Sequence, residues 1–445
     1  MPKKAIQLSD HFTYSRLLRF VLPCIGTMLF TSVYGIVDGL CVSNFVGKTA
    51  FAAVNLIMPL PQLLGTVGFM LGTGGSAIVG ITLGEGDQKK ADRYFTMFMW
   101  AALISVSVLA VLGILLLRPV AMLLGAKGEL LDYAVRYGRI LMLALPPFAL
   151  QNMFQSFFVT AEKPLLGFWF TVGAGCTNMV LDVVMVGMLH WGVEGAALAT
   201  LISQLVGGVL PVFYFIDHGN TSRLHLCRTQ FYGRVLWDAC INGSSELMTN
   251  LSMSLVNILY NFQLLRLAGE NGVAAYGVVA NLALVGIAVF TGLCTGIQPL
   301  VSRSSGLGDR EQLRRLFRWG ICTALGIAAV LCVSVFLGAE PLTAVFNSEH
   351  DPQLAAYAEN GLRIYFTGFL FAGVNMVTAA FFSASDKTVQ GFVLSLLRGV
   401  IAVPPILFPL AWALGVDGVW LTFPMVELVT AVAALIWARK YIIKN

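Results

Sequence analysis

Long apolar runs with almost no charges divide the chain, and short polar segments separate them. Runs of about 20 residues or more have the length that an α-helix needs to cross a bilayer. The strands of a membrane barrel would instead alternate over about ten residues, so the pattern favours helices. Twelve spans are predicted, at approximately 17–42, 50–80, 94–117, 134–160, 165–189, 193–216, 235–268, 273–303, 317–338, 356–382, 389–414 and 418–438.

The chain contains the same unit twice. Three pairs of segments match at spacings of 222, 223 and 224 residues: 76–87 (SAIVGITLGEGD) with 298–309 (QPLVSRSSGLGD), 192–195 (GVEG) with 415–418 (GVDG), and 133–160 with 357–384. Six spans fall in each half, which predicts two copies in the same orientation, related by an axis along the membrane normal. We place the N-terminal lobe at residues 1–225 and the C-terminal lobe at 226–445, with the polar stretch 217–234 as the linker.

Composition and charge agree with a membrane protein. Hydrophobic residues make up 57% of the chain and charged residues 11%, against about 25% charged in an average soluble domain. Most Lys and Arg residues outside the spans precede span 1, follow even-numbered spans or close the chain. The positive-inside rule therefore predicts that both termini are cytoplasmic. This bias accounts for the net charge of +5 without nucleic-acid binding.

The cysteines and histidines do not indicate a redox or metal centre. The eight cysteines are scattered without a Cys-x-x-Cys pair, which argues against a disulfide framework or a zinc site. All five histidines fall in the N-terminal tail or in loops. We expect no cofactor and no resident metal. The first apolar run is long and follows a polar start, which is typical of a retained span and not of a cleaved signal.

An ionised carboxylate within a span costs about 2.5–3.5 kcal/mol. Four acids in the predicted spans stand out: Asp38, Asp182, Glu246 and Glu427. Tyr34 lies one turn before Asp38 on the same helix face, close enough to donate a hydrogen bond. We interpret Asp38 as a carboxyl that exchanges a proton or a cation. The alternative is an acid at a helix end that reaches the outer interface.

Asn178 and Asp182 are four residues apart, so their side chains share one helix face. Spans 1 and 5 run in the same direction, and both acids lie past the middle of their spans. Asp38 and Asp182 can therefore lie at similar depth in one lobe. Two carboxyls at close range cannot both stay ionised, which suits a site loaded by protons from outside. The structural alternative is an Asn–Asp hydrogen bond that joins helices.

A polar stripe runs along span 7, and its members step by four, four, three and four residues: Glu246, Asn250, Ser254, Asn257 and Asn261. Such a face cannot point at lipid, so it lines either a cavity or a partner helix; the acid favours the cavity. Glu427 aligns with Gln204 at a spacing of 223 and is either a charged site or a structural hydrogen-bond partner. Arg398, in span 11, is either the partner of Glu427 or a ligand of lipid headgroups.

Taken together, these residues resemble the multidrug and toxic compound extrusion (MATE) transporters over nearly the whole chain. The resemblance rests on the duplicated twelve-span plan, on Pro23 and Asp38 in span 1, on Asn55 in the AAVN run, on the Gly-rich ends of spans 2 and 8, and on the Asn178/Asp182 pair. The segment Gly243 to Glu246 (GSSE) is most similar to a bacterial branch of that family.

The resemblance implies an all-α, V-shaped fold with two six-helix lobes around a cavity that alternates between the two sides of the membrane. Carried over by position, the proton or cation site of the N-terminal lobe consists of Asp38, Asn152, Asn178, Asp182 and Thr200. Glu246 is then the acid of the C-terminal lobe. Family members with a sodium site in that lobe use a further acid in span 10. This chain has Asn375 there, which shifts the expected site to the N-terminal lobe.

The resulting hypothesis is a secondary antiporter in a bacterial inner membrane that exports cationic amphipathic drugs or metabolites in exchange for H⁺. Na⁺, held at Asp38, Asn178 and Asp182, is the alternative coupling ion. We assign the substrate cavity to Tyr34, Glu246, Asn250, Asn257, Asn375 and Glu427. The expected partners are a small cationic molecule and the bilayer, with no nucleic acid, and the chain is expected to work as a monomer.

Two other classes compete with this hypothesis. A lipid-linked oligosaccharide flippase of the same broad superfamily needs a basic cavity for its pyrophosphate. We weigh against it the four acids named above, set against Arg398 and Arg266. An intramembrane enzyme needs a catalytic group, and no His-Glu pair, Ser-Lys arrangement or His cluster falls in a span. We therefore expect a transporter and not an enzyme.

Overall fold

The computed structural model describes residues 13–46, 53–54, 56–123, 126–217, 219, 221–346, 352–385 and 387–443. Within these ranges, the side chains of residues 33–46, 59, 250, 251, 254, 270, 345, 346 and 443 are not described. Of the residues on which predictions were made, Asn55 and the side chains of Tyr34, Asp38, Asn250 and Ser254 thus lie outside the described part. The chain divides into two compact units, Met1–Gly243 and Ser244–Asn445.

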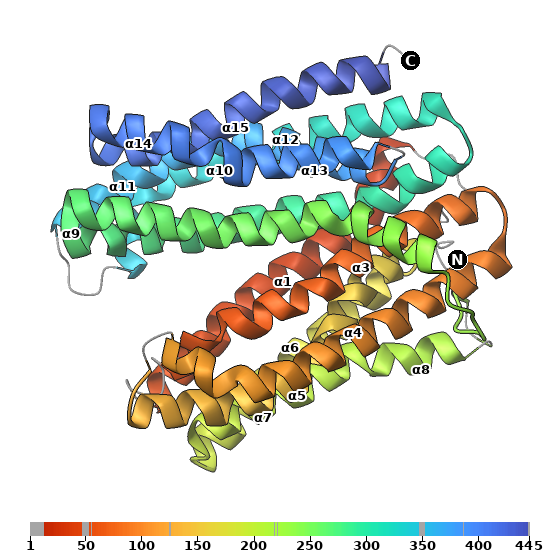
Figure 1. The fold of residues 1–445 in the computed structure, drawn as a ribbon. Helices are drawn as coiled ribbons and strands as arrows, with labels where there is room; N and C mark the ends of the chain where they lie inside the picture. Colours follow the sequence, from red (N-terminus) through yellow and green to blue (C-terminus); the bar gives the residue numbers. More distant parts are fainter. Residues whose placement is uncertain are drawn as a thin grey trace. The chain divides into compact units, whose positions relative to one another are not determined.

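The first unit is a helical bundle whose helices contact one another closely (Figure 1). Its elements are α1 (Tyr14–Val46), α3 (Pro59–Gly84), α4 (Gln88–Leu123), α5 (Glu129–Thr160), α6 (Pro164–Leu181), the π-helix η1 (Asp182–Met188), α7 (Gly192–Gly208) and α8 (Leu210–Ile216). Helix α5 packs against α3, α4 and α7, while α1 packs against α6 and η1. Helices α1, α5, α6 and α7, together with η1, carry the five residues of the predicted coupling site.

Small residues and aromatic rings hold the first unit together. Gly68 faces the backbone of Ala149, where an added Cβ would lie 2.4 Å from the carbonyl oxygen. Such close backbone approach suits helices in lipid, where van der Waals packing replaces the hydrophobic effect as the driving force. A cluster of fully buried rings fills the interior, with Phe154 stacked on Phe215 at 5.5 Å between centroids.

The second unit contains most of α9 (Gly233–Gly306) and all later helices. These are α10 (Arg310–Phe346), α11 (Pro352–Tyr365), the 3₁₀ turn η2 (Phe366–Gly368), α12 (Phe369–Ser383), α13 (Thr388–Leu396), the π-helix η3 (Leu397–Ile401), α14 (Val403–Leu414), α15 (Val416–Ala438) and the π-helix η4 (Arg439–Ile443). Helix α12 packs against α10, α13 and α15 (Figure 1). Predicted span 10 is thus α11 and α12 joined by the 3₁₀ turn η2, and predicted span 11 is α13 and α14 joined by the π-helix η3.

Helix α9 combines predicted spans 7 and 8, and its backbone leaves the helical conformation at Gly269 (φ 63°, ψ −149°). Its first turns belong to the first unit, because Gly243 lies against Met70; an added Cβ would come within 2.0 Å of the Met70 carbonyl oxygen. The packing thus divides the chain after Gly243, whereas the sequence analysis divides it after residue 225.

The polar stretch before α9 lies against the first unit. The backbone N–H of His225 donates to the carboxylate of Asp92 (3.1 Å), and Arg223 pairs with Glu162 (3.2 Å). Leu224 is fully buried in the core of that unit. The predicted linker is therefore packed along the first unit over much of its length.

The sequence repeat reappears as a repeated turn. Gly86 and Gly308, which the sequence match aligns, have φ of +89° and +69°, a conformation that glycine adopts without steric cost. The next residues, Asp87 and Asp309, each accept a hydrogen bond from the backbone N–H three residues later, at 3.0 and 2.9 Å. This is the N-cap arrangement that begins α4 and α10.

Nine helical stretches in the described part of the chain are long and apolar enough to cross a membrane. They correspond to predicted spans 2, 3, 5, 6 and 8 to 12. The remaining three predicted spans coincide with α1, with α5 and with the first part of α9, all of which are helical.

Candidate functional site

Asn178 and Asp182 lie one turn apart where α6 gives way to the π-helix η1. The backbone N–H of Asp182 still donates to the carbonyl of Asn178, and the wider helix begins at Asp182 itself. π-helical turns often mark functional positions, because the extra residue redirects the side chains around it. The side chains of Asn178 and Asp182 are 2% and 1% exposed, so an amide and an ionisable carboxyl are placed in the interior of the first unit.

Helix α5 contributes further amides to the same bundle. Asn152 is buried, as is Gln151 beside it, and Gln204 is buried on the neighbouring helix α7. Among the residues that the structure describes, neither Nδ2 of Asn152 and Asn178 nor Oε1 of Gln151 and Gln204 has a hydrogen-bond partner. A buried polar atom without a partner costs about 1–3 kcal/mol. These unpartnered amide atoms therefore lower the stability of the fold, which argues against a purely structural role for them.

Of the other predicted members of this site, the structure describes the side chain of Thr200 but not that of Asp38. Thr200, on α7, is half-buried and donates from Oγ1 to the Ala196 carbonyl within its own helix (3.0 Å). Asp38 lies on α1, which packs against both α6 and η1, but its side chain and that of Tyr34 lie outside the described part. Helix packing thus brings together the elements that carry the five residues.

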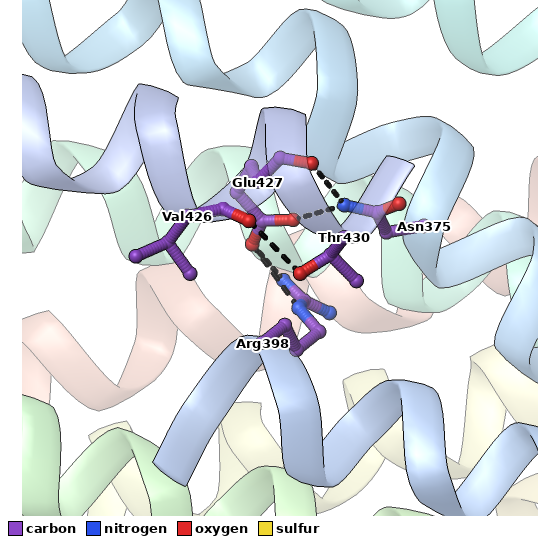
Figure 2. A network of polar contacts seen from close by, with 5 residues as sticks. All are labelled: Asn375, Arg398, Val426, Glu427 and Thr430. Atoms are coloured by element: carbon purple, nitrogen blue, oxygen red, sulfur yellow. Dashed lines mark hydrogen bonds and ion pairs between the residues drawn. The ribbon is translucent and has the colours of Figure 1, made fainter. Parts of the chain in front are cut away.

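The second unit contains a buried ionic network of Asn375 on α12, Arg398 on η3 and Glu427 on α15 (Figure 2). Arg398 donates to Oε1 of Glu427 from Nε at 3.1 Å and from Nη2 at 2.7 Å. Asn375 Nδ2 donates to Oε2 of Glu427 at 2.6 Å and to the Glu427 backbone carbonyl at 2.8 Å. Of the two predictions for Arg398, the structure shows the ion pair with Glu427.

The surroundings of this network explain its position. Glu427 is 2% exposed and Asn375 fully buried, so the carboxylate could not remain charged there without a cation beside it. The side chain of Ser252 on α9 lies close to Gly399 of the π-helix that carries Arg398: an added Cβ on Gly399 would lie 2.0 Å from Oγ of Ser252. The network therefore joins α12, η3 and α15 within one packed region.

Stacked rings line the part of the second unit around α9, α11 and α15. Tyr276 stacks on Tyr260 (5.2 Å) and faces Trp420 (6.4 Å), and its hydroxyl donates to Oδ1 of Asn257 at 2.6 Å. Asn257 and Tyr276 lie on opposite sides of the bend at Gly269, so this bond connects the two limbs of α9. Sequence reasoning found Asn257 from its spacing but had no signal for Tyr276.

Glu246 is half-buried on α9. Its neighbour Ser245 hydrogen-bonds Ser383 of α12 at 2.9 Å. Of the remaining stripe, Asn257 is exposed and Asn261 half-buried, and the side chain of Asn250 lies outside the described part. Among the described members of the stripe, Asn257 is therefore the most exposed.

A comparison with known protein families accounts for this architecture. The MatE family model matches residues 23–184 and again residues 247–408, and the two matches are offset by 224 residues (247 − 23), as are the longest repeated segments. The chain belongs to the MATE family. The resemblance inferred from the sequence and the predicted all-α membrane fold are thereby confirmed, and a MATE protein is a transporter and not an enzyme.

Curated relatives cover nearly the same length as this MATE protein. "Multidrug export protein MepA" of Staphylococcus saprophyticus is 23% identical over 423 residues, which is 95% of this chain and 93% of the relative. The protein of the same name from Staphylococcus haemolyticus is 22% identical over 422 residues, covering 95% and 92%.

Solved structures share the fold. An outward-facing multidrug resistance MATE family transporter of the MOP superfamily has a TM-score of 0.93 at 22% identity, over 99% of this chain and 98% of that one. A MOP superfamily transporter from Pyrococcus furiosus, described as having a binding pocket of reverse polarity, has a TM-score of 0.91 at 22% identity over the same shares. At this identity the likeness concerns the fold alone.

Sequence reasoning missed Gln151 and Gln155 beside the family-derived Asn152. Three amides within five residues of an apolar span are a signal of their own, because amides are costly in lipid. Oε1 of Gln155 also lacks a hydrogen-bond partner within the described residues. In this MATE protein, α5 thus presents a polar segment to the interior of the first unit.

Proposed function

We propose that this MATE protein is a secondary antiporter that exports cationic amphipathic compounds in exchange for H⁺ or Na⁺ by alternating access. The names of its relatives, which describe multidrug export, support the drug-like class of substrate. The acids within its spans support a positively charged one. In transporters with two like-oriented repeats, the substrate site lies between the repeats, and the two units are the two lobes of this proposal.

The coupling site in this proposal is the polar interior of the first unit: Asp38, Asn152, Asn178, Asp182 and Thr200. The observation that carries it is the burial of Asp182 in a bundle that also buries Nδ2 of Asn152 and of Asn178, and neither of these two atoms has a hydrogen-bond partner among the described residues. A carboxyl can hold a proton directly. Carboxylate and amide oxygens are also the ligands that a hard cation such as Na⁺ prefers, so the same residues serve either ion.

The acids of the second unit take different roles. Glu427 already has a cation, because Arg398 donates two hydrogen bonds to it. We therefore propose that Glu427 and Asn375 position helices beside the substrate cavity, and that Glu246 is the acid that attracts a cationic substrate. Asn250 and Asn257 would continue the cavity along α9, and Tyr34 would border it from α1.

Location and assembly complete the proposal. The protein crosses the bacterial inner membrane several times, with both termini cytoplasmic, and one chain is sufficient for transport. A flippase for anionic lipid-linked sugars is disfavoured, because the arginine of span 11 is neutralised by Glu427 and is not available to bind a pyrophosphate. An anionic pyrophosphate would require a cavity with more basic than acidic side chains.

Efflux of a fluorescent cation from proteoliposomes tests this proposal, with a pH gradient or a sodium gradient imposed across the membrane. Asp38→Asn and Asp182→Asn should each abolish gradient-driven efflux while the protein remains folded. Asp238→Asn is the matched control, because Asp238 is exposed on α9 and should not matter. Efflux at the normal rate in both variants of the first unit would remove the proposed coupling site.

A further inference from the structure

An apolar groove lies on the surface of the second unit between α10 and the α11–η2 segment. It has a volume of about 270 Å³ and is lined by Cys332, Val333, Phe336, Leu337, Leu362, Arg363, Phe366 and Thr367. Val333, Phe336 and Leu337 are 57%, 61% and 77% exposed. These side chains face outward from a helix that is apolar enough to span a membrane, so the groove opens toward lipid.

One charged residue stands in this groove. Arg363 is exposed, and its guanidinium lies over the ring of Phe336 at 5.6 Å from the centroid. Among the described residues, no carboxylate lies within 4.0 Å of it; the ion pairs found there involve other arginines. A cation–π contact stabilises the charge in part but supplies no counter-charge.

The depth of Arg363 in the helix makes this position unusual. Arg363 is eleven residues after Pro352, the first residue of α11, or about 16 Å along the helix. The span from Pro352 to Ser383 has 32 residues, about 48 Å, against a hydrocarbon core of about 30 Å. If the span is centred, the Cα of Arg363 lies about 7 Å below the hydrocarbon boundary, and its side chain can reach the headgroup level.

We propose that this groove binds an anionic phospholipid, with an acyl chain along Val333, Leu337 and Leu362 and the headgroup phosphate on Arg363. A guanidinium at this depth favours an anion beside it, and it binds phosphate by two parallel hydrogen bonds. Basic pockets between membrane helices recognise acidic headgroups in this way. The lipid occupies the leaflet on the side of the loop between α10 and α11.

The internal repeat adds an independent observation. Arg139 of α5 lies 224 residues before Arg363 (363 − 139) and is likewise exposed. Each unit thus retains an outward-facing arginine at the same position of the repeat. Lipid-facing arginines are rare within spans, so their occurrence in both copies argues for a ligand that a bilayer supplies.

Native mass spectrometry of the purified full-length protein, titrated with phosphatidylglycerol or phosphatidylcholine, tests this proposal. The wild type should retain phosphatidylglycerol in preference to phosphatidylcholine. Arg363→Gln should weaken phosphatidylglycerol binding about tenfold, as expected for the loss of a charge-assisted contact. Val333→Trp, which fills the groove from its exposed side, should reduce binding of the same lipid without changing any charge.

Arg136→Gln is the matched control, because Arg136 is also exposed but pairs with Glu194 at 3.7 Å; it should bind both lipids as the wild type does. Thermal unfolding of each variant establishes that it is folded. The proposal is overturned if Arg363→Gln retains the wild-type affinity for phosphatidylglycerol, if Val333→Trp has no effect, or if the wild type does not discriminate between the two headgroups.

Discussion

Arg398 and Glu427 form an ion pair in which both Nε and Nη2 of the guanidinium donate to a single carboxylate oxygen, at 3.1 and 2.7 Å. The other carboxylate oxygen accepts from Asn375 at 2.6 Å. The pair is 14% and 2% exposed on its two side chains. Arg398 and Glu427 therefore neutralise each other within the second unit. For this reason we assign Glu427 a structural role and not a role in coupling.

Arg398→Gln should destabilise the protein by about 3–5 kcal/mol, because it leaves the buried carboxylate of Glu427 without its cation. The double variant Arg398→Gln/Glu427→Gln should recover much of this loss, since neither charge then remains. Thermal unfolding of the purified protein in detergent measures both effects. Arg315→Gln serves as the control, because Arg315 pairs with Glu311 on an exposed face and should cost about 1 kcal/mol or less.

The same double variant distinguishes structural from coupling acids. If Glu427 only positions helices, the folded double variant still exports a cationic dye in response to a cation gradient. Loss of gradient dependence in a folded double variant would assign coupling to the second unit and contradict the division of roles proposed above.

Asn152→Leu should leave the unfolding temperature unchanged or raise it, because Nδ2 of Asn152 has no hydrogen-bond partner in the described part of the chain and leucine has a similar volume. Gradient-driven efflux should nevertheless fall, because the amide is proposed to serve the coupling ion. Stability and efflux are measured on the same preparation. A variant that transports normally, or that loses efflux only because it unfolds, would count against this role.

Gly243→Ala should destabilise the protein by about 1–3 kcal/mol through overpacking. The new methyl group would lie 2.0 Å from the Met70 carbonyl oxygen, so α9 could not keep its contact with α3. Gly173→Ala is the matched control on α6, because its added Cβ would meet no described atom within 4 Å apart from the backbone of its own helix and its chain neighbours, and it should be neutral or slightly stabilising. Equal unfolding temperatures for the two variants would show that the contact is dispensable.

Tyr276→Phe should cost about 0.5–1.5 kcal/mol, the value of one hydrogen bond, because it removes the bond to Asn257 and retains the ring. Tyr276→Leu should cost more, since the stacking on Tyr260 and the contact with Trp420 are lost as well. Thermal unfolding separates the two contributions. If both variants unfold together with the wild type, the bond does not hold the two limbs of α9.

The repeat and the positions of the helices could be predicted because they depend on local patterns. The match between residues 76–87 and 298–309 predicts like structure, and both segments end in a positive-φ glycine and an aspartate cap. The pairing of Asn178 with Asp182 on one face follows from helical spacing alone. These features need no knowledge of how distant helices pack.

Other features depend on packing between distant residues, and no local pattern in the sequence predicts them. The partner of Arg398 lies 29 residues further along the chain, so the sequence left two alternatives open. The π-helices at Asp182 and Leu397 shift side chains in ways that a regular period of 3.6 does not anticipate. The attachment of the first turns of α9 to the first unit depends on two small residues, Gly74 and Gly243.

The central claim is that the acids of the first unit couple export to the entry of a cation. Dye efflux from proteoliposomes, driven by separately imposed proton and sodium gradients, measures this directly for the wild type and Asp182→Asn. We predict that one of the two gradients accelerates efflux by the wild type and that neither accelerates efflux by Asp182→Asn. Equal acceleration in a folded Asp182→Asn protein, or wild-type efflux that ignores both gradients, would contradict the claim.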